Sequence, residues 1–125
     1  MIREEICTYE VCKLAKEKGF PQDVFGTCEM KSSCYLEDGS FHKGGCICPI
    51  EDAYTASTQS LLQRWLREEK NIMVEIPIWL QSDSSWRFRY KIQTKEDDII
   101  TWNDFPTYEL ALENAIKYAL ENLVV

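Results

Sequence analysis

In the stretch MVEIPIWLQSDSSWRFRYKIQ, residues 73–93, every even position on either side of the polar segment 81–85 is apolar. These positions are Val74, Ile76, Ile78, Leu80, Trp86, Phe88, Tyr90 and Ile92. Successive side chains of a strand point to opposite faces, so this pattern predicts two strands that share one apolar face. The polar segment 81–85 lies between them and predicts the turn of a β-hairpin.

Parity restricts how the two strands can pair, because side chains that face each other across an antiparallel pair share one side of the sheet. We expect the register in which Leu80 faces Trp86, with the even face buried. That register also pairs Ile78 with Phe88, Ile76 with Tyr90, Trp79 with Arg87, and Glu75 with Lys91. The Trp79 pair would make a cation–π contact and the Glu75 pair an ion pair. Pro77 has no N–H to donate, so its strand should lie at a sheet edge or carry a bulge.

The segments around the hairpin predict three amphipathic helices and further short strands. The expected helices cover about 9–18, about 57–70 and about 108–123, and the expected strands cover 24–30, 33–36 and 99–102. Thr8 and Thr107 are expected N-caps, Ser57 or Thr58 is expected to begin the middle helix, and Gly19 is the expected C-cap. This order favours an α+β fold in a single domain, 1–125. We expect an antiparallel sheet, with its hairpin at about 73–93, and about three helices packed on one face.

The composition restricts the partners and the compartment. The chain has 14 basic and 21 acidic residues and a formal net charge of −7, which repels a phosphate backbone. No apolar stretch approaches the roughly 20 residues that span a bilayer, and the first residues contain no hydrophobic signal region. We therefore expect a cytoplasmic protein without membrane contact, whose thiols are reduced.

All six cysteines and the single histidine lie within residues 1–48. Five of these seven residues fall in a cysteine-rich segment at about 24–50, expected to be irregular or β. They are Cys28, Cys34, His42, Cys46 and Cys48. Their spacing, C-x5-C-x7-H-x3-C-x-C, leaves open a zinc-stabilised module, although the C-x2-C pairs typical of structural zinc sites are missing. The interpretation we favour is ordinary reduced cysteine without a cofactor. Cys7 and Cys12 are five residues apart and would point about 140° apart on a helix, so they could not chelate one ion from it.

The sequence contains no recognisable catalytic motif. Gly-x-Ser-x-Gly, Walker A, Gly-x-Gly-x-x-Gly and His-Glu-x-x-His patterns are all missing from it. A cysteine nucleophile with His42 as its base would lack an orienting third group. We therefore expect no enzymatic activity and name no catalytic residue.

The odd-numbered face of the hairpin is the candidate interaction surface. Its members are Met73, Trp79, Arg87, Arg89 and Lys91. Contiguous apolar surface often marks an interface, so we favour a small accessory protein that acts through protein–protein contact, with a partner or as a homodimer. Cations interleaved with an aromatic ring leave open a further alternative, weak binding of single-stranded nucleic acid.

Three blocks of the sequence carry a resemblance to a known family. The block TQSLLQRWLREEKNIMVEI (58–76) resembles one found in small uncharacterised proteins of gut bacteria and their prophages. EVCKLAKEKGF (10–20) and YELALE (108–113) are similar to the same family. The resemblance implies a cytoplasmic accessory protein associated with prophages, and it brings no known activity, cofactor or site residue. Relatives often have histidines near the positions of Lys70 and Met73, and the cysteine cluster is particular to this chain.

Overall fold

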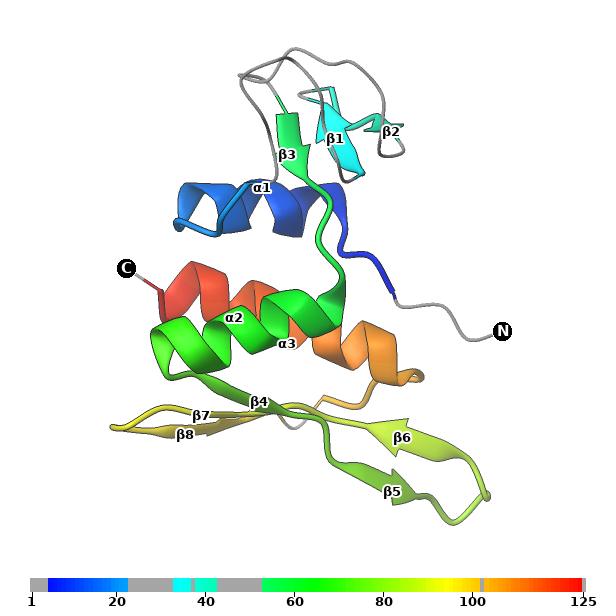
Figure 1. Cartoon of the computed structure of the whole chain (residues 1–125). Coiled ribbons are helices and arrows are strands. Elements are labelled where there is room, and N and C mark those ends of the chain that lie inside the picture. The colour runs from blue at the N-terminus through cyan, green and yellow to red at the C-terminus, as the bar shows by residue number, and fades with distance from the viewer. Residues whose placement is uncertain (1–4, 23–32, 37, 43–52, 102, 125) are drawn as a thin grey trace.

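The structure is a computed structural model, which describes all residues except 1–4, 23–32, 37, 43–52, 102 and 125 (Figure 1). The helices in the described part are α1 (Tyr9–Glu17), α2 (Gln59–Lys70) and α3 (Tyr108–Asn122). The strands are β1 (Cys34–Leu36), β2 (Phe41–His42), β3 (Ala53–Thr55), β4 (Met73–Glu75), β5 (Ile78–Leu80), β6 (Trp86–Phe88), β7 (Lys91–Gln93) and β8 (Asp98–Ile100). They pair in the orders β2-β1-β3, β4-β7-β8 and β5-β6, always antiparallel. The expected α+β fold is confirmed.

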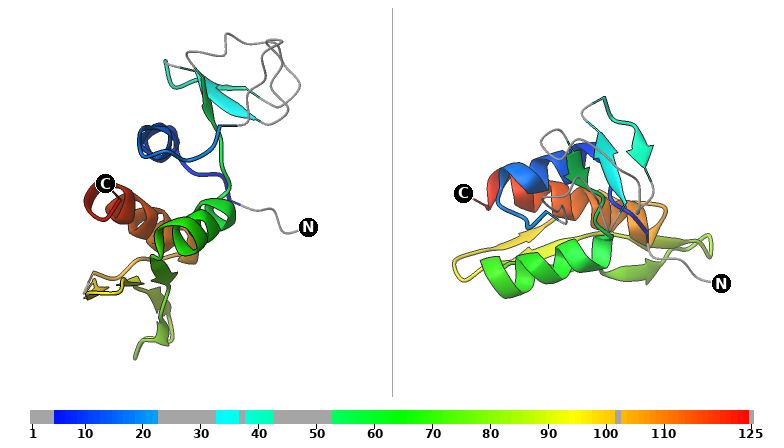
Figure 2. Two further views of the ribbon diagram at one scale, coloured as in Figure 1. Left: turned by 60° about the vertical axis from the view of Figure 1, so that its left-hand side comes forward. Right: turned by 45° about the horizontal axis from the view of Figure 1, so that its top comes forward.

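The elements are stacked in layers, with the three helices on one side of the β4-β7-β8 sheet (Figures 1 and 2). Helices α2 and α3 contact this sheet and each other. Helix α1 packs on α3 and on β3, so it forms a further layer between α3 and the β2-β1-β3 sheet. This layering explains why one hydrophobic cluster includes residues from all three helices and from β4 and β7.

The three helices begin and end where the sequence predicts. Thr8, Thr58 and Thr107 are the N-caps, and each side-chain oxygen accepts a hydrogen bond from the backbone N–H three residues later. After α1, Gly19 takes a φ of +97°, and the chain turns so that Phe20 N–H bonds the Ala15 carbonyl at 2.9 Å. Asn71 ends α2 in the same left-handed region, with a φ of 56°.

Polar contacts at Glu113 join the beginnings of α1 and α2 to the middle of α3. Oε2 of Glu113 accepts hydrogen bonds from the backbone N–H and the hydroxyl of Thr8, both at 3.0 Å. Oε1 accepts a bond of 2.9 Å from the side-chain amide of Gln59, which is 4% exposed. Gln59 also donates to the Glu109 carbonyl at 2.8 Å. A carboxylate between two helix N-termini fits their positive ends, so this contact fixes the relative positions of the helices.

The predicted hairpin register is confirmed at every described pair. Leu80 faces Trp86, Trp79 faces Arg87, Ile78 faces Phe88, Glu75 faces Lys91, Val74 faces Ile92 and Met73 faces Gln93. Pro77 interrupts this ladder without shifting it. Arg89 N–H still donates to the Pro77 carbonyl at 3.1 Å, but Pro77 has no N–H to return. Beyond β4 and β5 no further strand pairs among the described residues, as expected for a proline-containing edge.

The expectation that the whole even face is buried is wrong. Ile92 is fully buried and Val74 is 7% exposed, because α2 and α3 cover this end of the hairpin. Ile78, Leu80 and Trp86 are 52%, 54% and 58% exposed. The reason is a difference in length. The 12 residues of α2 rise about 18 Å, whereas the arm from Met73 to Leu80 extends about 27 Å.

Two isoleucines on this face give a matched test. We expect Ile92→Ala to lower the free energy of unfolding by about 2–5 kcal/mol, because it leaves a cavity beneath the helices. Ile78→Ala should cost less than about 1 kcal/mol, because its side chain is already half in water. Urea unfolding followed by circular dichroism measures both. Equal losses would contradict the division of this face into a covered and an open end.

Candidate functional site

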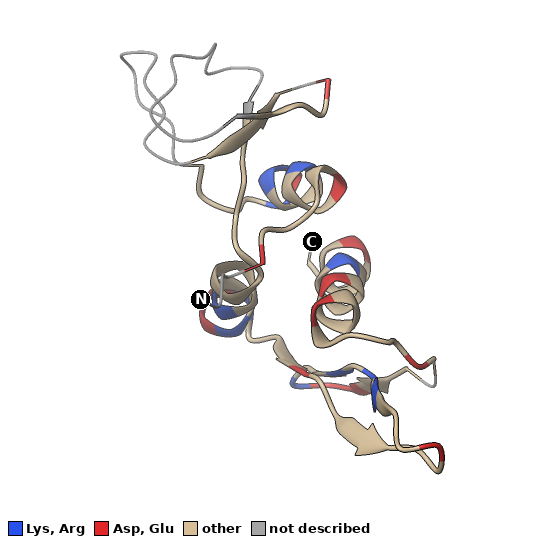
Figure 3. Cartoon of the chain, turned by 90° about the vertical axis from the view of Figure 1, so that its right-hand side faces the viewer, with Lys and Arg blue, Asp and Glu red and all other residues tan. Residues whose placement is uncertain are grey.

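The distal end of the hairpin carries an exposed apolar surface, which we name the open hairpin surface and define as Ile78, Leu80 and Trp86. These side chains belong to β5 and β6, which extend beyond the helices in Figure 1. Large exposed apolar groups that lie together on one face of a sheet are uncommon unless they meet a partner. Strand β5 itself carries no charged residue (Figure 3). The surface therefore suits an apolar partner.

Aromatic side chains form the inner border of this surface, where the sheet meets the first turn of α3. Phe88 packs edge-to-face against Tyr108, with the ring centroids 6.3 Å apart. Phe88 and Phe105 exchange two backbone hydrogen bonds of 3.1 and 2.8 Å, which occupy the outer edge of β6. The border is therefore fixed to the body of the protein, and β5 forms the free side of the hairpin.

The turn at the tip of the hairpin is closed by its own hydrogen bonds. Asp83 accepts bonds from the backbone N–H of Ser85 at 2.9 Å and from its hydroxyl at 2.5 Å. These bonds favour the ionised carboxylate and hold the pKa of Asp83 below its usual value. The Gln81 amide donates to Asp104 Oδ2 at 3.3 Å, which joins the turn to the segment before α3. The open hairpin surface is thus carried by an ordered turn.

The odd face differs from the expected interaction surface at Trp79. The guanidinium of Arg89 lies 4.1 Å from the centre of the Trp79 ring, so Arg89 makes the cation–π contact that we expected of Arg87. Nε of Arg89 also forms an ion pair of 2.9 Å with Asp104. Trp79 is consequently half-buried. Arg87 instead donates to the Gln81 side chain at 3.4 Å.

The remaining candidates on this face lie at its other end. Met73 is 40% exposed and Lys91 is half-buried. Lys91 faces Glu75 as predicted, but the structure shows no ion pair between these two described residues. With Arg89 paired to Asp104, the predicted basic stripe has lost one of its three cations, and the face offers less to a phosphate backbone.

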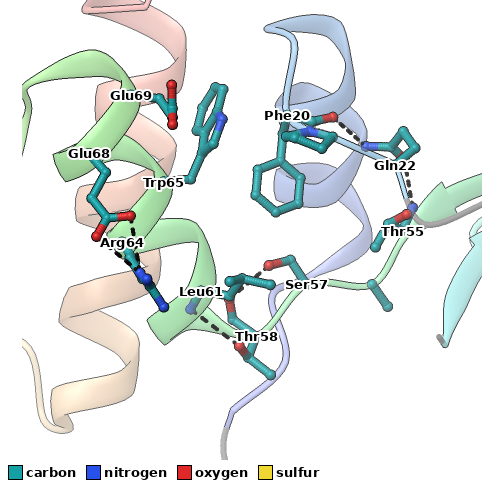
Figure 4. Close-up of a pocket in the computed structure, with 12 residues that line it drawn as sticks. Phe20, Gln22, Thr55, Ser57, Thr58, Leu61, Arg64, Trp65, Glu68 and Glu69 are labelled. Carbon is teal, nitrogen blue, oxygen red and sulfur yellow. Dashed lines mark hydrogen bonds and ion pairs between the residues drawn. The ribbon is translucent and has the colours of Figure 1, made fainter.

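A cavity of about 630 Å³ lies between the segment after α1, one side of α2 and the segment that joins β3 to α2 (Figure 4). Phe20 and Trp65 line it and contact each other edge to face, with their ring centroids 5.4 Å apart. The side chain of Gln22 bonds the Phe20 carbonyl and the Thr55 N–H at one rim, and Arg64 pairs with Glu68 at the other. Sequence reasoning missed this cavity because α1 and α2 are far apart in the chain. Leu61 is 50% exposed and lines the cavity.

Two of the five predicted metal ligands lie on paired strands. Cys34 in β1 is fully buried, and its backbone pairs with that of His42 in β2. Cys28, Cys46 and Cys48 lie outside the described residues. Within the described residues, no group of three or more histidine, cysteine or acidic side chains is placed to hold an ion.

Cys7 and Cys12 form a buried thiol pair beneath the first turn of α1. Both are at most 1% exposed, and Cys12 Sγ donates to the Cys7 carbonyl at 3.7 Å. The Tyr35 hydroxyl donates to the same carbonyl at 2.7 Å. Burial raises the pKa of Cys12 to about 11, and it raises that of Cys7 further, assisted by the nearby Glu113 carboxylate. Neutral thiols are poor nucleophiles, so this pair has a packing role.

Comparisons of the chain with protein-family models, with curated proteins and with solved structures give no match. Among the helices of the described residues, none combines the length and the apolarity needed to cross a membrane.

The buried thiols predict a specific dependence on pH. The pKa of Cys12 rises from an ordinary 9.0 to about 11 in the folded protein, so its contribution to stability is complete below pH 9. Between about pH 9 and pH 11 the unfolded thiol ionises while the folded one does not, and that contribution is lost. Guanidinium unfolding at pH 8 to 11 should show a steeper loss of stability for the wild type than for Cys12→Ala. Identical pH profiles, or rapid alkylation of Cys12 in the native protein, would contradict this.

Proposed function

We propose that this chain acts through protein–protein contact, and that a second copy of the chain covers its open hairpin surface. The observation that carries the proposal is the exposure of Ile78, Leu80 and Trp86 together on one face of a hairpin with paired strands. Burying one such side chain fully is worth about 1.5–3 kcal/mol, and each here retains roughly half of its exposed area. Covering part of this area therefore supplies part of the free energy of a moderate association.

The distribution of charge supports a second copy as the occupant. The chain as a whole is acidic, with a net charge of −7, so two copies repel each other at long range. The arm of the hairpin from Ile76 to Ser82 has no charged residue. Two acidic copies can therefore meet there without bringing like charges into contact. As part of this proposal we retain the cytoplasmic, accessory role expected from the sequence.

Two leucines of similar exposure provide a test of this surface, one within it and one outside it as a control. Leu80 is 54% exposed on β5, and Leu61 is 50% exposed on α2. We expect light scattering across a concentration series to show a dimer for the wild type, and Leu80→Ser to weaken it at least about tenfold, which corresponds to about 1.4 kcal/mol. Leu61→Ser should leave it unchanged. Raising the salt concentration should strengthen the wild-type dimer by screening the repulsion.

Two outcomes would count against this function. A wild-type chain that stays monomeric at millimolar concentration would remove the second copy as the occupant. Dissociation caused by Leu61→Ser but not by Leu80→Ser would move the contact to the cavity between α1 and α2.

A zinc-stabilised module is the second candidate, and the pairing of Cys34 with His42 in the β1–β2 register favours it. Two cross-strand residues can supply half of a tetrahedral site. If zinc is bound, native mass spectrometry should find one ion per chain, and a chelator should lower the melting temperature of the wild type but not of Cys34→Ala. A metal-free mass after growth in zinc-supplemented medium would exclude this candidate.

A further inference from the structure

We infer that the contact is made by strand pairing, in which β5 of one copy pairs antiparallel with β5 of a second copy about a two-fold axis at Trp79. This inference rests on the function proposed above and deepens it, because it specifies the backbone groups that meet. It follows from the hydrogen-bond pattern of the hairpin and from the residues at its free edge.

The hydrogen-bond pattern shows which backbone groups of β5 are free. In an antiparallel pair, hydrogen-bonded and non-hydrogen-bonded residue pairs alternate. Gln81 N–H donates to the Ser85 carbonyl at 2.8 Å, and Arg89 N–H donates to the Pro77 carbonyl at 3.1 Å, so the odd-numbered residues make the bonds inside the hairpin. The N–H and C=O groups of Ile78 and Leu80 therefore point away from β6. No strand of the described chain lies on that side.

The free edge lacks the features that usually prevent strand pairing. Exposed edges are commonly protected by lysine, by proline or by a bulge. Pro77 is the only proline in the hairpin, but its missing N–H belongs to the inner side, where Arg89 lies, and it leaves the outer edge intact. The register is the same on both sides of Pro77, so no bulge bends the arm. The outer edge of β5 therefore presents donors and acceptors that a further strand can use.

Symmetry restricts how two such edges can pair. A two-fold contact is self-complementary, so a pairing of residue i with residue j occurs twice. With the axis at Trp79, Ile78 of each copy pairs with Leu80 of the other, and the free groups of both residues can form four backbone hydrogen bonds. An axis at Leu80 would pair Ile78 with Ser82, which lies in the turn. The axis at Trp79 uses both free residues of the strand. It also sets the side chains of Ile78 and Leu80 of the two copies side by side on one face, where each shields part of the apolar area of the other.

Hydrogen exchange of single amides, measured by NMR at low and high protein concentration, tests this geometry. The Ile78 and Leu80 amides should exchange at least about tenfold more slowly at the concentration where light scattering shows a dimer. The Trp79 amide serves as the internal control, because it is bonded inside the hairpin and should be protected at both concentrations.

The outcomes separate this inference from the proposed function. A dimer in which the Ile78 and Leu80 amides exchange at the monomer rate would overturn strand pairing while leaving self-association in place. A monomer at every concentration would overturn both. Protection of these two amides in a monomeric sample would show that another segment of the same chain occupies the edge, which also overturns the inference.

Discussion

The antiparallel register of the hairpin is the constraint on which the rest of the structure depends. One register runs from the Met73–Gln93 pair to the Leu80–Trp86 pair, although Pro77 removes a ladder bond in the middle. Because side chains alternate between faces, a slip of one residue would move Val74 and Ile92 out of contact with the helices. The register therefore determines the packing of α2 and α3, and equally the set of apolar side chains that remain exposed.

The covered and open ends of the hairpin differ because strands extend about twice as far per residue as helices rise. The chain turns back at Asn71 from the end of α2 into β4, and the beginning of α2 at Gln59 lies short of the hairpin tip (Figure 1). Hydrogen bonds to Glu113 hold the beginnings of α1 and α2 against α3. Because the helices are held at this position, they do not cover Leu80. The exposed apolar surface thus follows from element lengths and helix positions.

The sequence predicted the features that depend on neighbouring residues. The N-caps of α1 and α3 followed from Thr8 and Thr107, the end of α1 followed from Gly19, and the hairpin register followed from parity alone. Burial along the hairpin could not be predicted in this way, because Ile78 and Ile92 carry the same pattern and differ only in what lies above them. The cavity beside Trp65 and the contact of Arg89 with Trp79 likewise depend on tertiary packing. Of the candidate site, the sequence indicated the hairpin, but the exposure of Ile78, Leu80 and Trp86 depends on where the helices lie.

Fluorine NMR of the protein labelled with 5-fluorotryptophan tests the central claim, that the hairpin presents an apolar surface which a second copy covers. The Trp86 resonance is assigned with Trp86→Phe. In dilute solution it should show a solvent isotope shift typical of an exposed ring. As the concentration rises, the shift of Trp79, which lies on the proposed two-fold axis, should shrink. The half-buried Trp65, beside the cavity, should keep its shift. A Trp86 ring that is shielded from solvent in the dilute monomer would contradict the account.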